Sequence, residues 1–141
     1  MIKNENQHTK KDIQNFLEIL FRLSESRGKE AAGLAVRGEG SIDVLKLPIA
    51  ATDFLKSSEY KRFSDKVFEG FWAAIGHARL TTHGTEYFSH NNQPVIKEKA
   101  VCVHNGIIVN EKQLWEKFPA LKREFEVDTE VLSGLLQLFF A

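Results

Sequence analysis

The sequence has only one cysteine, Cys102, among its 141 residues. An intramolecular disulfide and a multi-cysteine zinc motif are therefore excluded. No apolar run approaches the roughly 20 residues that span a bilayer, and the polar N-terminus is unlike a signal peptide. Neither sign of charge is in excess, since 19 basic side chains balance 19 acidic ones. We therefore expect a cytoplasmic protein that binds neither nucleic acid nor membrane.

The remaining composition is that of one globular domain. Hydrophobic residues make up 43% of the chain and charged residues 27%, which are ordinary values for a folded protein. A chain of 141 residues is long enough to bury a core. We see no repeats and no linker, and we expect residues 1–8 to be disordered.

The pattern of apolar residues predicts a mixture of helices and strands. Thr9 and Asp12 have the spacing of a capping box, which opens an amphipathic helix that ends near Ser26. An Asn105-Gly106 turn is typical of a hairpin, with the apolar residues 107–109 returning from it. The other expected elements are strands over 32–36, 42–47, 71–77 and 100–104, one or two surface helices within 48–69, and helices over 111–118 and 129–140.

Two polar blocks follow two of these strands. The first is GHARLTTHG, residues 76–84, and the second is HNG, residues 104–106. Polar residues at strand ends are commonly held together by the scaffold as a site. We expect the two blocks to lie side by side at one edge of a sheet.

The residues of the first block suit an α-amino acid. Arg79 has a fork of donors that can hold a carboxylate through two hydrogen bonds. Thr82 and His83 follow in a loop and can add donors to the same anion. Asp128, which precedes a predicted helix, can receive an ammonium group. In isolation, Arg79 also fits a surface ion pair and Asp128 a helix cap.

The second block can stabilise an oxyanion. Asn105 and Gly106 can direct a side-chain amide and a backbone N–H at one point, as acyl transfer requires. The alternative is a purely structural hairpin turn. Gly28 and Gly33 are interpreted as turn or close-packing positions.

A metal site is the other function considered for this region. Four histidines lie within 28 residues, namely His77, His83, His90 and His104. Their spacing matches no standard ligand pattern, so we expect no metal and no cofactor. Cys102 alternates with valines in a strand, and we expect it to pack in the core.

Five blocks occur in order along the chain: residues 26–36, 76–84, 91–94, 103–108 and 128–130. Together they resemble the class II glutamine amidotransferases, above all the glutaminase half of glutamine–fructose-6-phosphate aminotransferase. The resemblance implies an α+β fold, the αββα sandwich of the N-terminal-nucleophile (Ntn) hydrolases, here incomplete at both ends. It implies one partial glutamine amidotransferase type 2 domain over residues 1–141.

The resemblance also implies a role for each matching residue. Arg79, Thr82 and His83 would hold the α-carboxylate of glutamine, and Asp128 its α-amino group. Asn105 and Gly106 would form the oxyanion hole. Arg27 would order the site. The implied reaction releases ammonia from glutamine, for transfer to an acceptor such as a sugar phosphate. The implied partner is a synthase or sugar-isomerase domain or subunit.

The sequence departs from the family at its N-terminus. The family's nucleophile is an N-terminal cysteine whose own α-amine is the base. Here Met1 is followed by polar residues, and Cys102 has no free α-amine. We therefore expect the chain alone to be inactive. The uncapped apolar end favours a fragment, and the alternative is a pseudoenzyme that senses glutamine or binds a protein partner.

Overall fold

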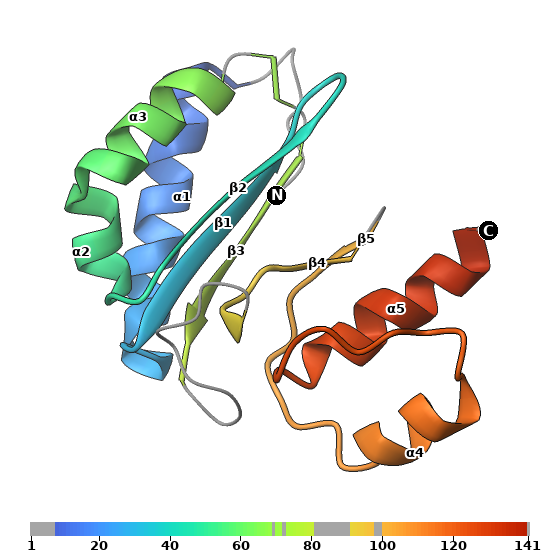
Figure 1. The fold of residues 1–141 in the computed structure, drawn as a ribbon. Helices are drawn as coiled ribbons and strands as arrows, with labels where there is room; N and C mark the ends of the chain where they lie inside the picture. Colours follow the sequence, from blue (N-terminus) through green and yellow to red (C-terminus); the bar gives the residue numbers. More distant parts are fainter. Residues whose placement is uncertain (1–7, 69, 72, 81–90, 98–99, 141) are drawn as a thin grey trace.

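The computed structural model describes residues 8–68, 70–71, 73–80, 91–97 and 100–140. It forms layers in the order helices, sheet, sheet, helix (Figure 1). The first layer holds α1 (Lys10–Ser24), α2 (Ala51–Lys56) and α3 (Ser58–Val67). The last layer is α5 (Thr129–Phe140), which packs on the second sheet. The expected αββα arrangement is thus present.

Helix α1 begins as the sequence predicts. The side-chain oxygen of Thr9 accepts the backbone N–H of Asp12, and the Asp12 carboxylate accepts the N–H of Thr9 at 2.9 Å. This capping box satisfies two donors that have no partner inside the helix. The helix ends at Ser24 and continues as one 3-10 turn, Glu25–Arg27, which places Arg27 beyond the helix proper.

The first sheet has the strand order β2-β1-β3 and is antiparallel throughout. Its strands are β1 (Ala31–Arg37), β2 (Ile42–Leu47) and β3 (Ala73–Arg79). In this register Gly33 lies opposite both Lys46 and His77. Strand β3 begins and ends two residues later than predicted, so Arg79 is its last residue rather than a loop residue.

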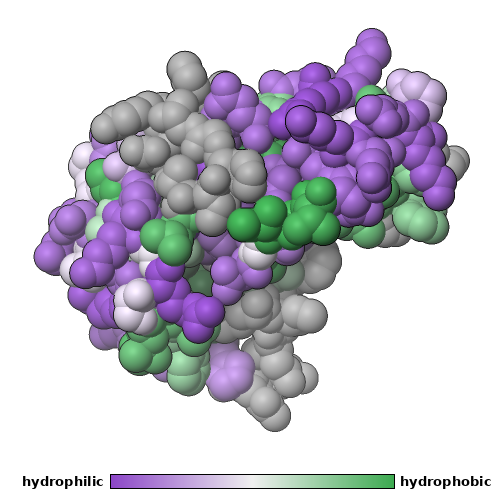
Figure 2. Space-filling model, turned by 90° about the horizontal axis from the view of Figure 1, so that it is seen from below, coloured by the Kyte–Doolittle hydropathy of each residue, from purple (hydrophilic) through white to green (hydrophobic). Residues whose placement is uncertain are grey.

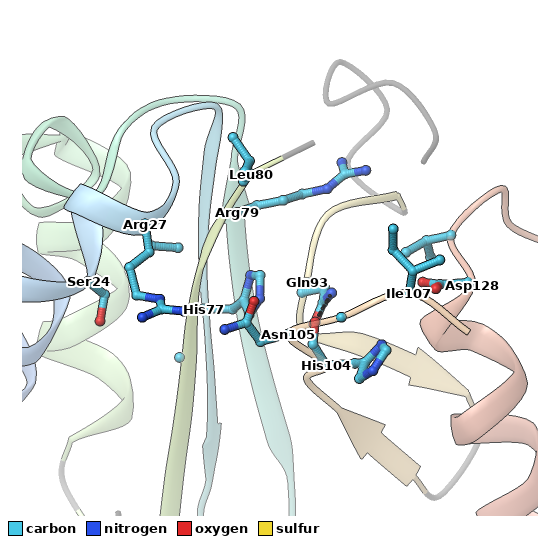
Figure 3. A pocket seen from close by; sticks show the side chains of 14 residues that line it. Ser24, Arg27, His77, Arg79, Leu80, Gln93, His104, Asn105, Ile107 and Asp128 are labelled. Carbon is cyan, nitrogen blue, oxygen red and sulfur yellow. Dashed lines mark hydrogen bonds between the residues drawn. The ribbon is translucent and has the colours of Figure 1, made fainter. Parts of the chain in front are cut away.

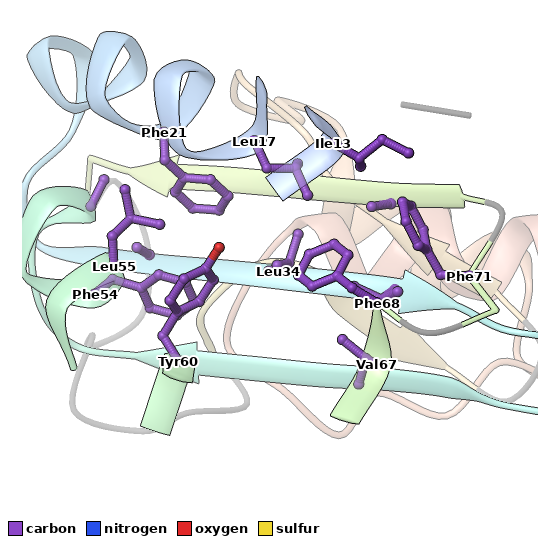
Figure 4. Close-up of a cluster of buried hydrophobic side chains, with 14 residues drawn as sticks. Ile13, Leu17, Phe21, Leu34, Phe54, Leu55, Tyr60, Val67, Phe68 and Phe71 are labelled. Carbon is purple, nitrogen blue, oxygen red and sulfur yellow. The ribbon is translucent and has the colours of Figure 1, made fainter. Parts of the chain in front are cut away.

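The main core lies between this sheet and its helices (Figure 4). Phe54 is fully buried, and its ring stacks on Phe21 at 5.4 Å between centroids and contacts Tyr60 at the same distance. The expected surface helices are therefore amphipathic, with one face in the core. This packing fixes α1, and with it the position of Arg27.

The second sheet is the short antiparallel pair β4 (Val95–Lys97) and β5 (Ala100–Cys102). Sequence patterning missed β4, and the strand expected over 100–104 ends at Cys102. Helix α4 (Glu111–Lys117) precedes α5 in the chain. Cys102 is half-buried rather than deep in the core. None of the described helices is long and apolar enough to cross a membrane.

The expected hairpin after Asn105-Gly106 is wrong. Residues 107–109 form no strand. The N–H of Ile108 instead donates to Asp128 Oδ2 at 2.7 Å. A carboxylate from a distant segment therefore takes a backbone donor that a hairpin would have used for strand pairing.

Candidate functional site

A cavity of about 480 Å³ opens between the two sheets, at the end where β3 finishes (Figure 3). Viewed from this end, the described residues present a mainly hydrophilic surface, and hydrophobic side chains gather in smaller patches (Figure 2). Five segments line the cavity: the end of α1 with its 3-10 turn, the end of β3, Gln93 before β4, the turn after β5, and the two residues before α5. Five predicted site residues are among its lining: Arg27, Arg79, Asn105, Gly106 and Asp128. Thr82 and His83 lie outside the described residues.

The two polar blocks do not share one sheet edge. Arg79 ends β3 of the first sheet, whereas Asn105 and Gly106 follow β5 of the second. The expectation of one edge is wrong, yet both blocks face the same cavity because the two sheets are stacked. In Figure 3, Asn105 lies beside His77, and Asp128 approaches from the side of α5.

Arg79 is held firmly in the cavity wall. Its side chain is only 3% exposed, and Nη1 donates to Asn92 Oδ1 at 2.7 Å. Its main chain packs on Gly28, where an added Cβ would lie 2.2 Å from the carbonyl carbon of Arg79. The close-packing interpretation of Gly28 is confirmed. Arg79 is therefore not an exposed surface residue but a buried cation in the wall of the cavity.

Asp128 is also buried, at 4% exposed, immediately before α5. Its Oδ2 accepts the N–H of Ile108, which ties α5 to the segment that follows Asn105-Gly106. A buried carboxylate is costly without partners. A cation bound in the cavity would offset part of that cost. The carboxylate of Asp128 and the guanidinium of Arg79 give the cavity one acidic and one basic wall.

Two histidines complete the polar wall. The Nδ1 atoms of His77 and His104 are buried and have no hydrogen-bond partner among the described residues. Burial, and then the nearby Arg79 cation, lower the pKa of His77 below its usual value. His77 is therefore a neutral imidazole at pH 7 and adds a polar, uncharged surface to the cavity.

Sequence reasoning missed the roles of three consecutive amides, Asn91, Asn92 and Gln93. All three are buried, and each bonds a different part of the site. Asn92 holds Arg79, as described above. Asn91 exchanges two hydrogen bonds with Glu126, donating to its carboxylate at 2.7 Å and accepting its N–H at 3.1 Å. Residues 91–94 are one of the blocks that carry the family resemblance, but the sequence assigned no role to these three amides.

A buried ion pair behind the site was missed as well. Lys97 Nζ donates to Glu130 Oε1 at 2.6 Å, and Glu130 is fully buried. The same carboxylate accepts the N–H groups of Glu124 and Phe125, both at 2.8 Å. These bonds join β4, the loop before α5, and α5 itself, so they set where Asp128 lies.

Comparison with known proteins gives the same family as the sequence motifs. Residues 77–139 match the model of the glutamine amidotransferase domain. The chain is 34% identical over 138 residues to a glutamine–fructose-6-phosphate aminotransferase (isomerizing) of Campylobacter jejuni, covering 95% of this chain and 21% of that protein. The enzyme of the same name from Thermotoga maritima is 36% identical over 129 residues, covering 89% of this chain and 20% of that protein. The chain thus spans about a fifth of the length of these relatives.

A solved structure has the same fold. The glutamine phosphoribosylpyrophosphate amidotransferase from B. subtilis, complexed with ADP and GMP, aligns with a TM-score of 0.58 and 22% identity. The alignment covers 89% of this chain and 26% of that chain. The Ntn-hydrolase fold is confirmed, and so is the resemblance to the class II glutamine amidotransferases.

Proposed function

Since residues 77–139 match the glutamine amidotransferase domain, we propose that this chain binds L-glutamine in the cavity between its sheets. The observation that carries the proposal is the placing of Arg79 and Asp128 in the wall of one cavity of about 480 Å³. Arg79, with Thr82 and His83, holds the α-carboxylate. Asp128 receives the α-ammonium.

The remaining predicted residues act on the side chain of glutamine. The side-chain amide of Asn105 and the N–H of Gly106 donate to the carbonyl oxygen of the glutamine amide. Arg27 lies on the α1 side of the cavity and orders the region where a nucleophile would stand. Preorganised donors of this kind typically stabilise an oxyanion by about 3 kcal/mol each.

In a complete enzyme this pocket serves ammonia release. The α-amine of an N-terminal cysteine takes the proton of its thiol, and the thiolate attacks the amide carbon to form the oxyanion against Asn105 and Gly106. The same amine then returns the proton to the amide nitrogen, which leaves as ammonia as the γ-glutamyl thioester forms. Water then releases glutamate. We propose a sugar phosphate as the acceptor of the ammonia, on a synthase or sugar-isomerase domain or subunit. The support is the similarity to isomerizing aminotransferases that act on fructose 6-phosphate.

The 141-residue chain has no cysteine at its N-terminus, so we expect it to release no ammonia when it is purified alone. The measurement is ammonia production from glutamine, compared with a control without protein. Ammonia above that control would contradict this expectation. A chain that binds glutamine without hydrolysing it also fits a glutamine-sensing or protein-interaction module, which is the alternative function.

Calorimetry with L-glutamine tests the pocket itself. Arg79→Ala removes the partner of the carboxylate, and a charged hydrogen bond is worth about 1.5–3 kcal/mol. We therefore expect binding to weaken by up to about 100-fold. Arg22→Ala is the matched control, because Arg22 is an exposed arginine paired with Glu18 on α1. Equal affinity of Arg79→Ala and the wild-type chain, with both folded, would remove the proposed function.

A further inference from the structure

The side chain of Gln93 binds the main chain of His104, the residue directly before the proposed oxyanion donors Asn105 and Gly106. Its Oε1 accepts the N–H of His104 at 2.5 Å, and its Nε2 donates to the carbonyl oxygen of His104 at 2.8 Å. A single side-chain amide thus makes both bonds that a neighbouring strand would make with one residue. Strand β5 ends at Cys102, so Gln93 continues the pairing to the residue before Asn105.

The same amide reaches the start of α5. The second hydrogen of Nε2 is donated to Thr129 Oγ1 at 3.2 Å. Thr129 is fully buried and follows Asp128 directly. The side-chain amide of Gln93 therefore connects two segments: the one that leads to Asn105 and Gly106, and the one that begins with Asp128.

Gln93 is itself immobilised from the other side. It is only 7% exposed. Its main-chain oxygen packs on Gly33 of the first sheet, where an added Cβ would lie 2.0 Å away. The main chain of Gln93 is thus packed against the first sheet, which also holds Arg79.

We propose that Gln93 is a positioning residue, which sets the Asn105-Gly106 turn relative to Asp128 so that the side-chain amide of glutamine meets its donors. This role rests on the proposed function. Arg79 and Asp128 recognise any α-amino acid, so Gln93 governs the preference for a side-chain carbonyl. Without the amide, His104 keeps its chain neighbours but loses both bonds that fix its peptide.

The first measurement is amide hydrogen exchange, which needs no ligand. Gln93→Met keeps the length of the side chain and removes both polar ends. We expect exchange at His104 to become about tenfold faster and the resonance of Gly106 to shift. Gln93→Glu keeps an acceptor for the N–H of His104, so it should restore part of the protection. Unchanged exchange at His104 in a folded variant would overturn the proposal.

The second measurement is calorimetry with L-glutamine and with L-norvaline, which has the same α-groups and carbon count but no amide. We expect the wild-type chain to prefer glutamine about tenfold, and Gln93→Met to lose that preference while binding norvaline within about threefold of wild type. Ser64→Ala is the control, since Ser64 has the same exposed fraction and lies on α3. It should keep the preference.

The outcomes separate the proposed binding of glutamine from the proposed positioning role of Gln93. A wild-type chain that binds neither amino acid refutes the proposed function. A wild-type chain that prefers glutamine, with the preference kept in Gln93→Met, refutes the role of Gln93 alone. If Gln93→Met does not fold, Gln93→Glu replaces it in the calorimetry, because Gln93→Glu loses the donors to the carbonyl oxygen of His104 and to Thr129.

Discussion

Glu130→Gln is expected to lower the free energy of unfolding by about 3–5 kcal/mol, the usual cost of leaving one partner of a buried ion pair alone. The wild-type carboxylate is fully buried and accepts from Lys97 and from two backbone N–H groups. These two N–H groups donate to different oxygens, Oε1 and Oε2. A glutamine must therefore turn its own NH₂ toward a donor, and it leaves the Lys97 ammonium without its buried counter-charge. Urea unfolding followed by circular dichroism measures the loss.

The control for this variant is an exposed ion pair. Glu18→Gln removes the partner of Arg22 on the surface of α1, where the charges are 3.8 Å apart. Surface pairs of this kind contribute about 0–1 kcal/mol, so little change is expected. Adding Lys97→Met to Glu130→Gln should recover stability, because it removes a buried ammonium that would be left, among the described residues, with only the exposed Glu124 as an ion-pair partner, at 3.6 Å. A loss below about 1 kcal/mol for Glu130→Gln would show that the pair does not hold α5 in place.

Gly33→Ala is the second large effect, with an expected loss of about 3 kcal/mol. The added Cβ would lie 2.0 Å from the Gln93 oxygen and 2.9 Å from Pro94, so the two sheets must separate locally. Gln93 would move with its main chain. We therefore expect the variant to lose both stability and glutamine binding, which chemical unfolding and calorimetry report separately.

Gly40→Ala is the matched control for this substitution. Nothing lies within 4 Å of a Cβ added at Gly40, which precedes β2 in the turn after β1. Removing a glycine there reduces the freedom of the unfolded chain, so stability should stay equal or rise by about 0.4–1 kcal/mol. If Gly33→Ala behaves like Gly40→Ala, the sheets are not in the close contact described above.

Local patterns were sufficient for the elements of the first half of the chain. The capping box at Thr9 and the bounds of β2 depend on residues a few positions apart, and both were predicted correctly. The motifs predicted seven site residues, and the structure places five of them around one cavity, while Thr82 and His83 lie outside the described residues. The stacking of the two sheets then brings together Arg79 and Asp128, which are far apart in the chain.

Local patterns failed where a partner lies far along the chain. Gln93 bonds Thr129, 36 positions later in the chain, and Lys97 bonds Glu130, 33 positions later. Contacts between such distant positions produce no periodic pattern in the sequence. The turn at Asn105-Gly106 has the sequence of a hairpin, but Asp128 takes the N–H of Ile108 from 20 positions away. Buried polar groups must find partners wherever the packed layers put them, because an unmet hydrogen bond in the interior is expensive. The sequence therefore supplied the candidate recognition residues, and the packing of one sheet on the other determined their arrangement and the residues that hold them.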